Sequence, residues 1–217
     1  MHAPVTTPLR GVYLLTPDEP DTGRLLARLA PLLAERPALL QYRNKAASPA
    51  LRREQARALL ADCGRYAVPL VLNDDWHLAA DLGAAGAHLG SDDGDLKAAR
   101  AALGQAAILG ASCYDAIDRA QFAAAAGASY LAFGACFASG TKPLVRRAAL
   151  SLFGQARRLG LPTVAIGGIT ADNAPLAVAA GADLLAVIGG VFDADDSVAA
   201  LRALQSAFTS TSPGARP

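Results

Sequence analysis

The chain has 217 residues, of which 53% are apolar, and its formal net charge is +1. This length suits one domain with a sizeable core, and the small net charge gives no excess of cations to neutralise a nucleic-acid backbone. No stretch approaches the roughly 20 consecutive apolar residues that cross a bilayer, so we expect neither a nucleic-acid partner nor a membrane partner.

Short apolar runs alternate along the chain with longer segments rich in Ala, Leu and Arg, whose apolar residues recur at helical spacing. The short runs predict strands over residues 12–16, 39–43, 70–73, 87–90, 108–112, 130–134, 163–167 and 184–188. The longer segments predict helices that include residues 23–35, 49–66, 117–126, 146–159, 173–180 and 197–208. Apolar strands separated by helices are typical of a parallel sheet, because parallel strands need crossover connections. Eight such units predict an α/β fold, a single-domain (β/α)8 TIM barrel.

Glycines punctuate this alternation. Gly83, Gly127 and Gly181 each stand where a predicted helix should end, and glycine accepts the left-handed conformation that closes helices. The competing architecture is an open doubly wound sheet, whose usual G-x-G-x-x-G signal follows the first strand. Here residues 15–18 read Leu-Thr-Pro-Asp instead, which favours the closed barrel.

The cysteines and the two ends of the chain bear on its environment. Cys63, Cys113 and Cys136 are scattered singly, without metal-type spacing, and residues 1–8 lack the apolar run of a signal peptide. We therefore expect a reducing cytoplasm. Ser, Thr, Pro and Gly dominate residues 209–217, which predicts a disordered tail after a domain over residues 10–208, with a flexible N-terminus over residues 1–9.

The second predicted strand runs into Gln41-Tyr42-Arg43-Asn44-Lys45. Side chains alternate across a strand, so Gln41, Arg43 and Lys45 should project from the same face. Buried cations are costly unless an anion meets them, and this row therefore predicts a phosphorylated substrate. The alternative is an edge strand whose charged face is solvated.

Polar residues also follow the other predicted strands. In a barrel the catalytic groups cluster at the carboxyl ends of the strands and in the loops that follow. The residues in these places are Asn73-Asp74-Asp75, Ser91-Asp92-Asp93, Ser112, Ser139-Gly140-Thr141-Lys142 and Gly167-Gly168. Together with the end of the second strand, they predict one functional rim.

The carboxylates of this rim would repel one another unless a cation lies among them. Mg²⁺ suits such a place, because it binds one or two carboxylates together with water and phosphate oxygens. Asp74 and Asp93 are the candidate ligands, whereas Asp75 and Asp92 are in positions typical of helix caps. The alternative is that the whole set caps helices and holds no metal.

Phosphate sites in barrels often use backbone N–H groups after strands seven and eight. Gly167-Gly168 and Gly189-Gly190 would let an anion approach the main chain, and the hydroxyls and ammonium of residues 139–142 could meet a second phosphate. His88, between Ala87 and Leu89, is interpreted as a hydrogen-bonded core histidine rather than a catalytic base. No Ser/His/Asp order stands out.

With these residues assembled, the chain resembles the thiamine phosphate synthase family from about residue 10 to residue 208. The stretches that carry the resemblance are residues 41–45, 73–74, 88–93, 110–112, 134–142, 165–169 and 181–183. The resemblance implies condensation of a hydroxymethylpyrimidine diphosphate with a thiazole phosphate, which gives thiamine phosphate and releases diphosphate. It implies Mg²⁺ as the cofactor and these two small molecules as the partners.

The family's residue roles are carried over onto matching positions. The resemblance implies that the pyrimidine diphosphate is held by Gln41, Tyr42, Arg43, Asn44, Lys45, Asn73, Ser112 and Lys142. Among these, Arg43, Lys45, Ser112 and Lys142 would be catalytic. Asp74 and Asp93 would bind Mg²⁺, and the thiazole phosphate would be held by Ser139, Gly140, Thr141, Gly168, Ile188 and Gly189. The family reaction passes through a pyrimidine-stabilised carbocation that the thiazole nitrogen captures, so the lack of a catalytic triad is expected.

The chain departs from the family pattern at three positions. Ser139 stands where threonine is usual, Gly189 where a serine is typical, and Ser91 where glutamine is frequent. Two rival functions stay open: a thiazole tautomerase-like barrel that needs neither diphosphate nor metal, and a non-catalytic barrel that binds a phosphorylated metabolite. The sequence is compatible with a homo-oligomer and leaves the number of subunits open.

Overall fold

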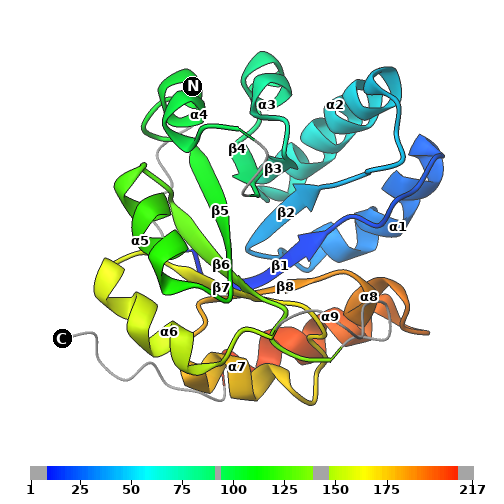
Figure 1. The fold of residues 1–217 in the computed structure, drawn as a ribbon. Coiled ribbons are helices and arrows are strands. Elements are labelled where there is room, and N and C mark those ends of the chain that lie inside the picture. The colour runs from blue at the N-terminus through cyan, green and yellow to red at the C-terminus, as the bar shows by residue number, and fades with distance from the viewer. Residues whose placement is uncertain (1–8, 91–93, 139–146, 210–217) are drawn as a thin grey trace.

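The computed structural model describes residues 9–90, 94–138 and 147–209 of the chain. Within these residues, eight parallel strands close into a barrel in sequence order, and β1 pairs with β8 (Figure 1). The strands are β1 (Gly11–Leu15), β2 (Leu39–Tyr42), β3 (Leu70–Asn73), β4 (Gly86–Leu89), β5 (Ile108–Tyr114), β6 (Tyr130–Gly134), β7 (Thr163–Ile166) and β8 (Leu184–Val187). The predicted (β/α)8 barrel is confirmed. The proposed terminal segments lie almost wholly outside the described residues.

Helices surround the strands on the outside of the barrel (Figure 1). They are α1 (Thr22–Ala34), α2 (Pro49–Tyr66), α3 (Trp76–Leu82), α4 (Leu96–Leu103), α5 (Ile117–Ala125), α6 (Ser151–Ala156), the 3₁₀ turn η1 (Arg157–Leu159), α7 (Ala174–Ala180), α8 (Gly189–Phe192) and α9 (Ser197–Ser206). Asp75 caps α3, because its Oδ1 accepts a hydrogen bond from the Leu78 N–H at 2.9 Å. The cap predicted for Asp75 is therefore confirmed.

The helix predicted over residues 146–159 is wrong at its beginning. In the structure α6 starts at Ser151, and residues 147–149 are irregular. The backbone N–H of Ala148 donates to the carbonyl oxygen of Ala135 at 2.9 Å, and Ala148 is buried. This contact with the segment after β6 holds the chain out of the helical path, so a tertiary hydrogen bond overrides the local helical pattern.

The core has two parts, as the pleat of a closed sheet requires. The larger part lies between the strands and the surrounding helices and includes Leu25, Leu29 and Leu32 of α1. The smaller part fills the barrel interior with Tyr13, Leu15, Leu39, Val71, Ile108, Tyr130, Ala132, Val164, Leu184 and Ala186. These residues fix the inward positions of seven strands, all except β4, and polar residues of the same parity on those strands must point into the barrel mouth.

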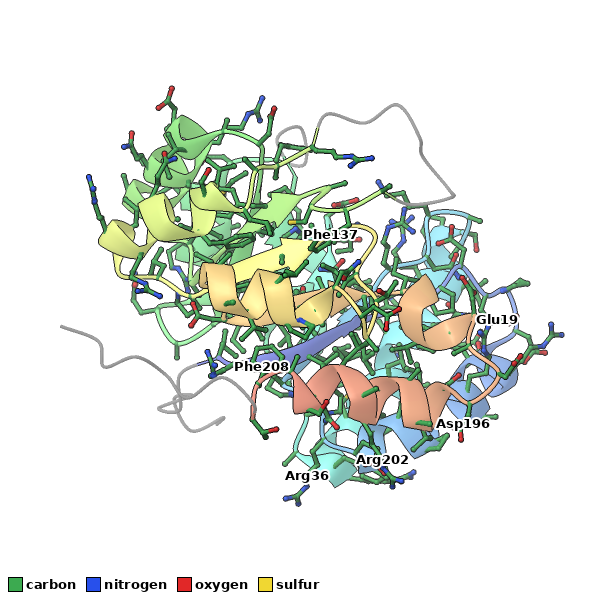
Figure 2. All side chains as sticks on the ribbon, turned by 90° about the horizontal axis from the view of Figure 1, so that it is seen from below. Glu19, Arg36, Phe137, Asp196, Arg202 and Phe208 are labelled. Carbon is green, nitrogen blue, oxygen red and sulfur yellow. The ribbon has the colours of Figure 1, made fainter. Side chains whose placement is uncertain are left out.

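Side chains from the first and the last elements of the sequence help to close the barrel. Arg202 of α9, labelled in Figure 2, forms two hydrogen bonds with the Glu35 carboxylate after α1, at 2.7 and 2.9 Å. Gln205 donates to the Glu35 carbonyl oxygen. The Arg10 guanidinium lies 5.2 Å from the centre of the Phe208 ring. These contacts join the first and last helices beside the β1–β8 seam.

Arg100 ties together the amino ends of β5 and β6. Its buried guanidinium donates to the carbonyl oxygens of Gly104, Ala107 and Gly127 at 2.7 to 2.9 Å, and to Ser129 Oγ at 2.8 Å. Burial lowers the pKa of Arg100. The cation is satisfied by backbone oxygens at the end of the barrel where such groups serve stability, opposite the mouth that carries function.

Candidate active site

A cavity of about 180 Å³ opens at the carboxyl ends of the strands. All eight strands contribute to its lining, from Tyr13 of β1 to Ala186 of β8. Its lining includes six residues that the sequence predicted for the site: Gln41, Arg43, Lys45, Asn73, Asp74 and Ser112. Groups from three stretches that are separate in the sequence, residues 41–45, 73–74 and 112, are therefore brought to one mouth.

A smaller cavity of about 60 Å³ adjoins this mouth and shares Arg43, Lys45, Asn73 and Asp74 with it. It is also lined by Arg52, which lies in the first turn of α2. Three cations, Arg43, Lys45 and Arg52, therefore surround one small space, which is a suitable environment for a multiply charged anion. Arg52 was not predicted; its position one turn after the cap of a helix that follows a functional strand was the available signal.

The residues after β1 hold the end of β2 in place. The Thr16 hydroxyl donates to the Arg43 carbonyl oxygen at 2.7 Å and accepts from the Arg43 N–H at 2.8 Å. Asp18 Oδ1 accepts from the Lys45 N–H at 2.9 Å and from Arg43 Nη1 at 3.3 Å. The backbone that carries both cations is thus fixed by side chains of the neighbouring loop, which the sequence reading passed over.

The side chains of residues 41–45 alternate as expected. Gln41, Arg43 and Lys45 all line the larger cavity. The Tyr42 hydroxyl instead donates to Gln55 Oε1 at 2.8 Å, and Asn44 Nδ2 donates to the Glu19 carbonyl oxygen at 2.8 Å. Tyr42 and Asn44 were predicted to bind the pyrimidine diphosphate, but their side-chain donors are directed toward α2 and the loop after β1. A direct contact with a ligand in the larger cavity would have to come from their backbone.

Two of the three cations of the mouth, Lys45 and Arg52, are paired with carboxylates at long distances. Lys45 Nζ lies 3.8 Å from Asp74 Oδ2, and Arg52 Nη1 lies 3.9 Å from Asp75 Oδ2. These side chains are partly exposed, so each pair contributes little to stability. A phosphate group entering the mouth could therefore exchange with the carboxylates at small cost.

Of the two predicted metal ligands, Asp74 lies within the residues that the structure describes. It has φ of 65°, which is uncommon for a residue other than glycine, and its N–H donates to the His88 carbonyl oxygen at 2.8 Å. Among residues 9–90, 94–138 and 147–209, no group of three or more His, Cys, Asp or Glu side chains could hold a metal ion. Asp93, the second predicted ligand, lies outside the described residues. The Asp74 carboxylate is a ligand type that suits Mg²⁺, which takes few protein ligands and completes its shell with water and phosphate oxygens.

The predicted thiazole phosphate site is described only in part. Ser139, Gly140, Thr141 and Lys142 lie outside the described residues. Gly168 has φ of 65°, and a Cβ there would overlap the backbone oxygens of Phe137 and Ala138. Ile188 precedes α8, and Gly189 is its first residue. The segments that follow β6 and β7 thus approach closely at backbone level beside Gly168, where only a residue without Cβ fits.

Three aromatic residues of the mouth were not predicted as site residues. Tyr13 and His88 are buried residues that line the floor of the cavity, and Tyr130 is buried without lining it. His88 Nε2 lies 2.9 Å from Ser112 Oγ. His88 is hydrogen-bonded, as its interpretation as a core histidine required, and it also lines the cavity. Every second residue of a barrel strand faces the interior, as Gln41 does on β2. Applying this alternation to the other predicted strands could have identified the three residues.

The family model described as thiamine monophosphate synthase matches residues 12–191. The chain belongs to this family. Its matched region begins in β1 and extends beyond β8, so it covers the barrel and the mouth just described.

Similar members of the thiamine monophosphate synthase family come from several bacteria. The chain is 57% identical over 200 residues to thiamine-phosphate synthase of Xanthomonas campestris pv. campestris strain 8004, covering 92% of this chain and 96% of that protein. It is 53% identical over 201 residues to the protein of the same name from Methylobacillus flagellatus, with coverages of 93% and 96%. A solved thiamine phosphate pyrophosphorylase from Pyrococcus furiosus superposes with a TM-score of 0.81 at 27% identity, covering 92% of this chain and 96% of that one.

Proposed function

We propose that the protein condenses 4-amino-2-methyl-5-hydroxymethylpyrimidine diphosphate with 4-methyl-5-(2-phosphoethyl)thiazole, giving thiamine phosphate and diphosphate. The observation that carries this proposal is the convergence of Gln41, Arg43, Lys45, Asn73, Asp74 and Ser112 on one cavity, in a chain of this family. The enzyme is accordingly a transferase of a pyrimidinylmethyl group.

The arrangement of charge supports a dissociative reaction. As the carbon–oxygen bond to diphosphate breaks, negative charge develops on the leaving group, and Arg43 and Lys45 lie at the cavity where they can stabilise it. Ser112 and Lys142 complete the proposed catalytic set. The electron-rich pyrimidine stabilises the carbocation left behind, and the thiazole nitrogen then forms the new carbon–nitrogen bond.

No protein nucleophile is needed for this reaction. Ser112 and His88 are close enough for a nucleophile and its base, but His88 Nδ1 faces the Tyr130 hydroxyl at 3.0 Å. In serine hydrolases the corresponding nitrogen is oriented by a carboxylate, which stabilises the imidazolium that forms. The phenol supports a binding role for Ser112 rather than a hydrolytic one.

Mg²⁺ is the proposed cofactor, held by Asp74 and Asp93. When bound, it would neutralise part of the diphosphate charge as a Lewis acid. Gln41, Asn73 and the backbone of residues 42 and 44 would hold the pyrimidine diphosphate, and Ser139, Gly140, Thr141, Gly168, Ile188 and Gly189 the thiazole phosphate.

The deciding experiment is a coupled assay for diphosphate release. We expect release only when both substrates and Mg²⁺ are present, and a magnesium-dependent rise in Tm with the pyrimidine diphosphate alone. A tautomerase-like barrel would respond to the thiazole without diphosphate or metal, and a binding barrel would show a rise in Tm without turnover. Either pattern would overturn the proposal.

The location and assembly of the protein are further parts of the proposal. Cys63, Cys113 and Cys136 are buried free thiols, which supports a reducing cytoplasm. No helix within the described ranges is long and apolar enough to cross a membrane. Light scattering on the purified protein would measure the number of subunits, and a homo-oligomer is compatible with the proposed chemistry.

A further inference from the structure

A chain of hydrogen bonds crosses the barrel interior beneath the cavity. Gln41 Nε2 donates to the Tyr13 hydroxyl at 2.5 Å, and the Tyr13 and Tyr130 hydroxyls are 2.7 Å apart. The Tyr130 hydroxyl lies 3.0 Å from His88 Nδ1, and His88 Nε2 lies 2.9 Å from Ser112 Oγ. The chain thus joins five strands, and its two ends, Gln41 and Ser112, both line the cavity.

The middle of this chain is shielded from water. Tyr130 is 0% exposed and does not line the cavity, and Tyr13 is 1% exposed. The rings of Tyr13 and Tyr130 meet edge to face, and His88 stacks on Tyr130. Burial raises the pKa of both phenols above their usual range, so each keeps its one hydrogen at neutral pH.

Counting the available hydrogens shows which group donates and which accepts at each step of this hydrogen-bond chain. Because Gln41 donates to Tyr13, the Tyr13 hydrogen can satisfy Tyr130, and the Tyr130 hydrogen can satisfy His88 Nδ1. A neutral imidazole then carries its hydrogen on Nε2 and donates it to Ser112 Oγ. The reverse order would leave the Tyr13 hydrogen facing the Gln41 N–H group, with no acceptor in the chain, which is costly in a buried site.

We infer that Tyr13, Tyr130 and His88 are positioning residues that fix Ser112 as a hydrogen-bond donor toward the pyrimidine diphosphate. With Ser112 Oγ already accepting from His88, its own hydrogen is left for an acceptor on the ligand. The hydrogen-bond chain therefore favours a ligand that places an acceptor atom next to the Ser112 hydroxyl, either a ring nitrogen or a diphosphate oxygen. This inference rests on the proposed function for the identity of the ligand.

The first test uses Tyr130→Phe, which removes one hydroxyl without changing the lining of the cavity. Loss of one hydrogen bond to the ligand corresponds to about a tenfold rise in KM. We expect that rise for the pyrimidine diphosphate, with the KM for the thiazole phosphate changed less than about twofold. A purely structural role would change both constants together or neither, and either result would overturn the inference.

A pair of variants at His88 gives a second test that does not depend on how well Tyr130→Phe folds. An amide carries an acceptor and a donor on neighbouring atoms, so His88→Gln can accept from Tyr130 and donate to Ser112. His88→Leu can do neither. We expect His88→Leu to raise the KM for the pyrimidine diphosphate and His88→Gln to recover most of the loss; equal KM values would contradict the inference.

The third test needs no substrate and so separates this inference from the proposed function. In ¹⁵N-labelled protein at pH 8, the imidazole nitrogen shifts report which nitrogen carries the hydrogen, and the spectrum of His88→Gln identifies the His88 signals. We expect the Nε2–H form in the wild type and a mixture of tautomers in Tyr130→Phe. The Nδ1–H form in the wild type would overturn the inference, whereas an inactive wild type with the Nε2–H form would overturn the proposed function alone.

Discussion

The Thr16 hydroxyl binds both backbone groups of Arg43, the carbonyl oxygen at 2.7 Å and the N–H at 2.8 Å. Thr16 is fully buried, and its own N–H donates to the Gln41 carbonyl oxygen. The hydrogen bonds of Thr16 thus extend the pairing of β1 with β2 beyond the last paired residue of β2. Thr16 thus fixes the backbone from which the Arg43 side chain enters the cavity, and Asp18 holds its guanidinium.

Thr16→Val should therefore be more harmful than its similar shape suggests. The isosteric valine leaves a backbone donor and an acceptor of Arg43 unpaired in a partly buried place, at a cost of about 1–3 kcal/mol in the free energy of unfolding. Urea denaturation of Thr16→Val beside Thr16→Ser measures this cost, because serine keeps the hydroxyl and loses only a methyl group. Equal stabilities of the two variants would show that the double hydrogen bond is unimportant.

Arg43→Ala tests the electrostatics of the mouth. Removal of this cation should weaken binding of the pyrimidine diphosphate by about 10- to 100-fold, because a charge-assisted hydrogen bond to phosphate is lost, and should change thiazole phosphate binding less. Isothermal titration with each substrate measures the two effects. The control is Arg36→Ala, an exposed arginine that precedes β2 instead of following it (Figure 2). Equal losses for both substrates would contradict the proposed site.

Gly110 makes room for the Tyr130 ring, because a Cβ at this position would overlap the ring and its hydroxyl. Gly110→Ala should lower the free energy of unfolding by about 1–3 kcal/mol through overpacking. The double variant Gly110→Ala/Tyr130→Ala should be more stable than the sum of the two single effects predicts, since the small side chain removes the overlap. Additive effects in this double-mutant cycle would refute the explanation.

Arg100→Lys should destabilise the fold without affecting substrate binding. Lysine keeps the charge but cannot donate to four groups in the fixed planar geometry of a guanidinium, so we expect a loss of about 2–4 kcal/mol. Arg53→Lys is the matched control, because Arg53 forms an exposed ion pair with Asp81. KM values should stay at the wild-type level in both variants. A raised KM in Arg100→Lys would imply coupling between the two ends of the barrel.

The buried thiols predict the response to high pH. Burial raises the pKa of Cys63 and Cys113 to about 12 and that of Cys136 to about 11. Since the folded pKa values exceed the ordinary value of about 9, the folded state holds these protons more tightly, and stability falls as pH rises from 9 toward 12. Iodoacetamide at pH 8 should label the thiols slowly in the native protein and fast in urea. Fast native labelling would show that the thiols are accessible.

Much of the fold could be predicted because local patterns and the barrel agree. The bounds of β3 and β6 match their predicted residues, and each strand is near-continuously apolar. The predicted fifth strand ended too early, at residue 112, whereas β5 ends at Tyr114. A register shift between Ser112 and Tyr114 extends the strand beyond its apolar run. The start of α6 was misplaced because the Ala148 N–H binds the segment after β6, a contact that no local pattern encodes.

The site could be predicted where a single segment shows inward and outward side chains in alternation, as residues 41–45 do. Arg52 and Asp18 were missed because their proximity to Arg43 arises from the packing of α2 and of the loop after β1, which no local pattern encodes. The roles of Tyr13 and Tyr130 could not be read from either strand alone. Their hydroxyls meet across 117 positions of sequence, and the closed barrel brings them within hydrogen-bond distance.

The pairing of β1 with β8 has a consequence for the nascent chain. Gly11 lies opposite Leu184, so the first strand emerges from the ribosome roughly 170 residues before its final partner. At 5–20 residues per second, one edge of β1 has no native partner for about 10–35 s. An apolar strand with an open edge can pair with another chain during that interval. Protein yield should therefore depend on the speed of translation between β1 and β8 and on chaperones that cover this edge.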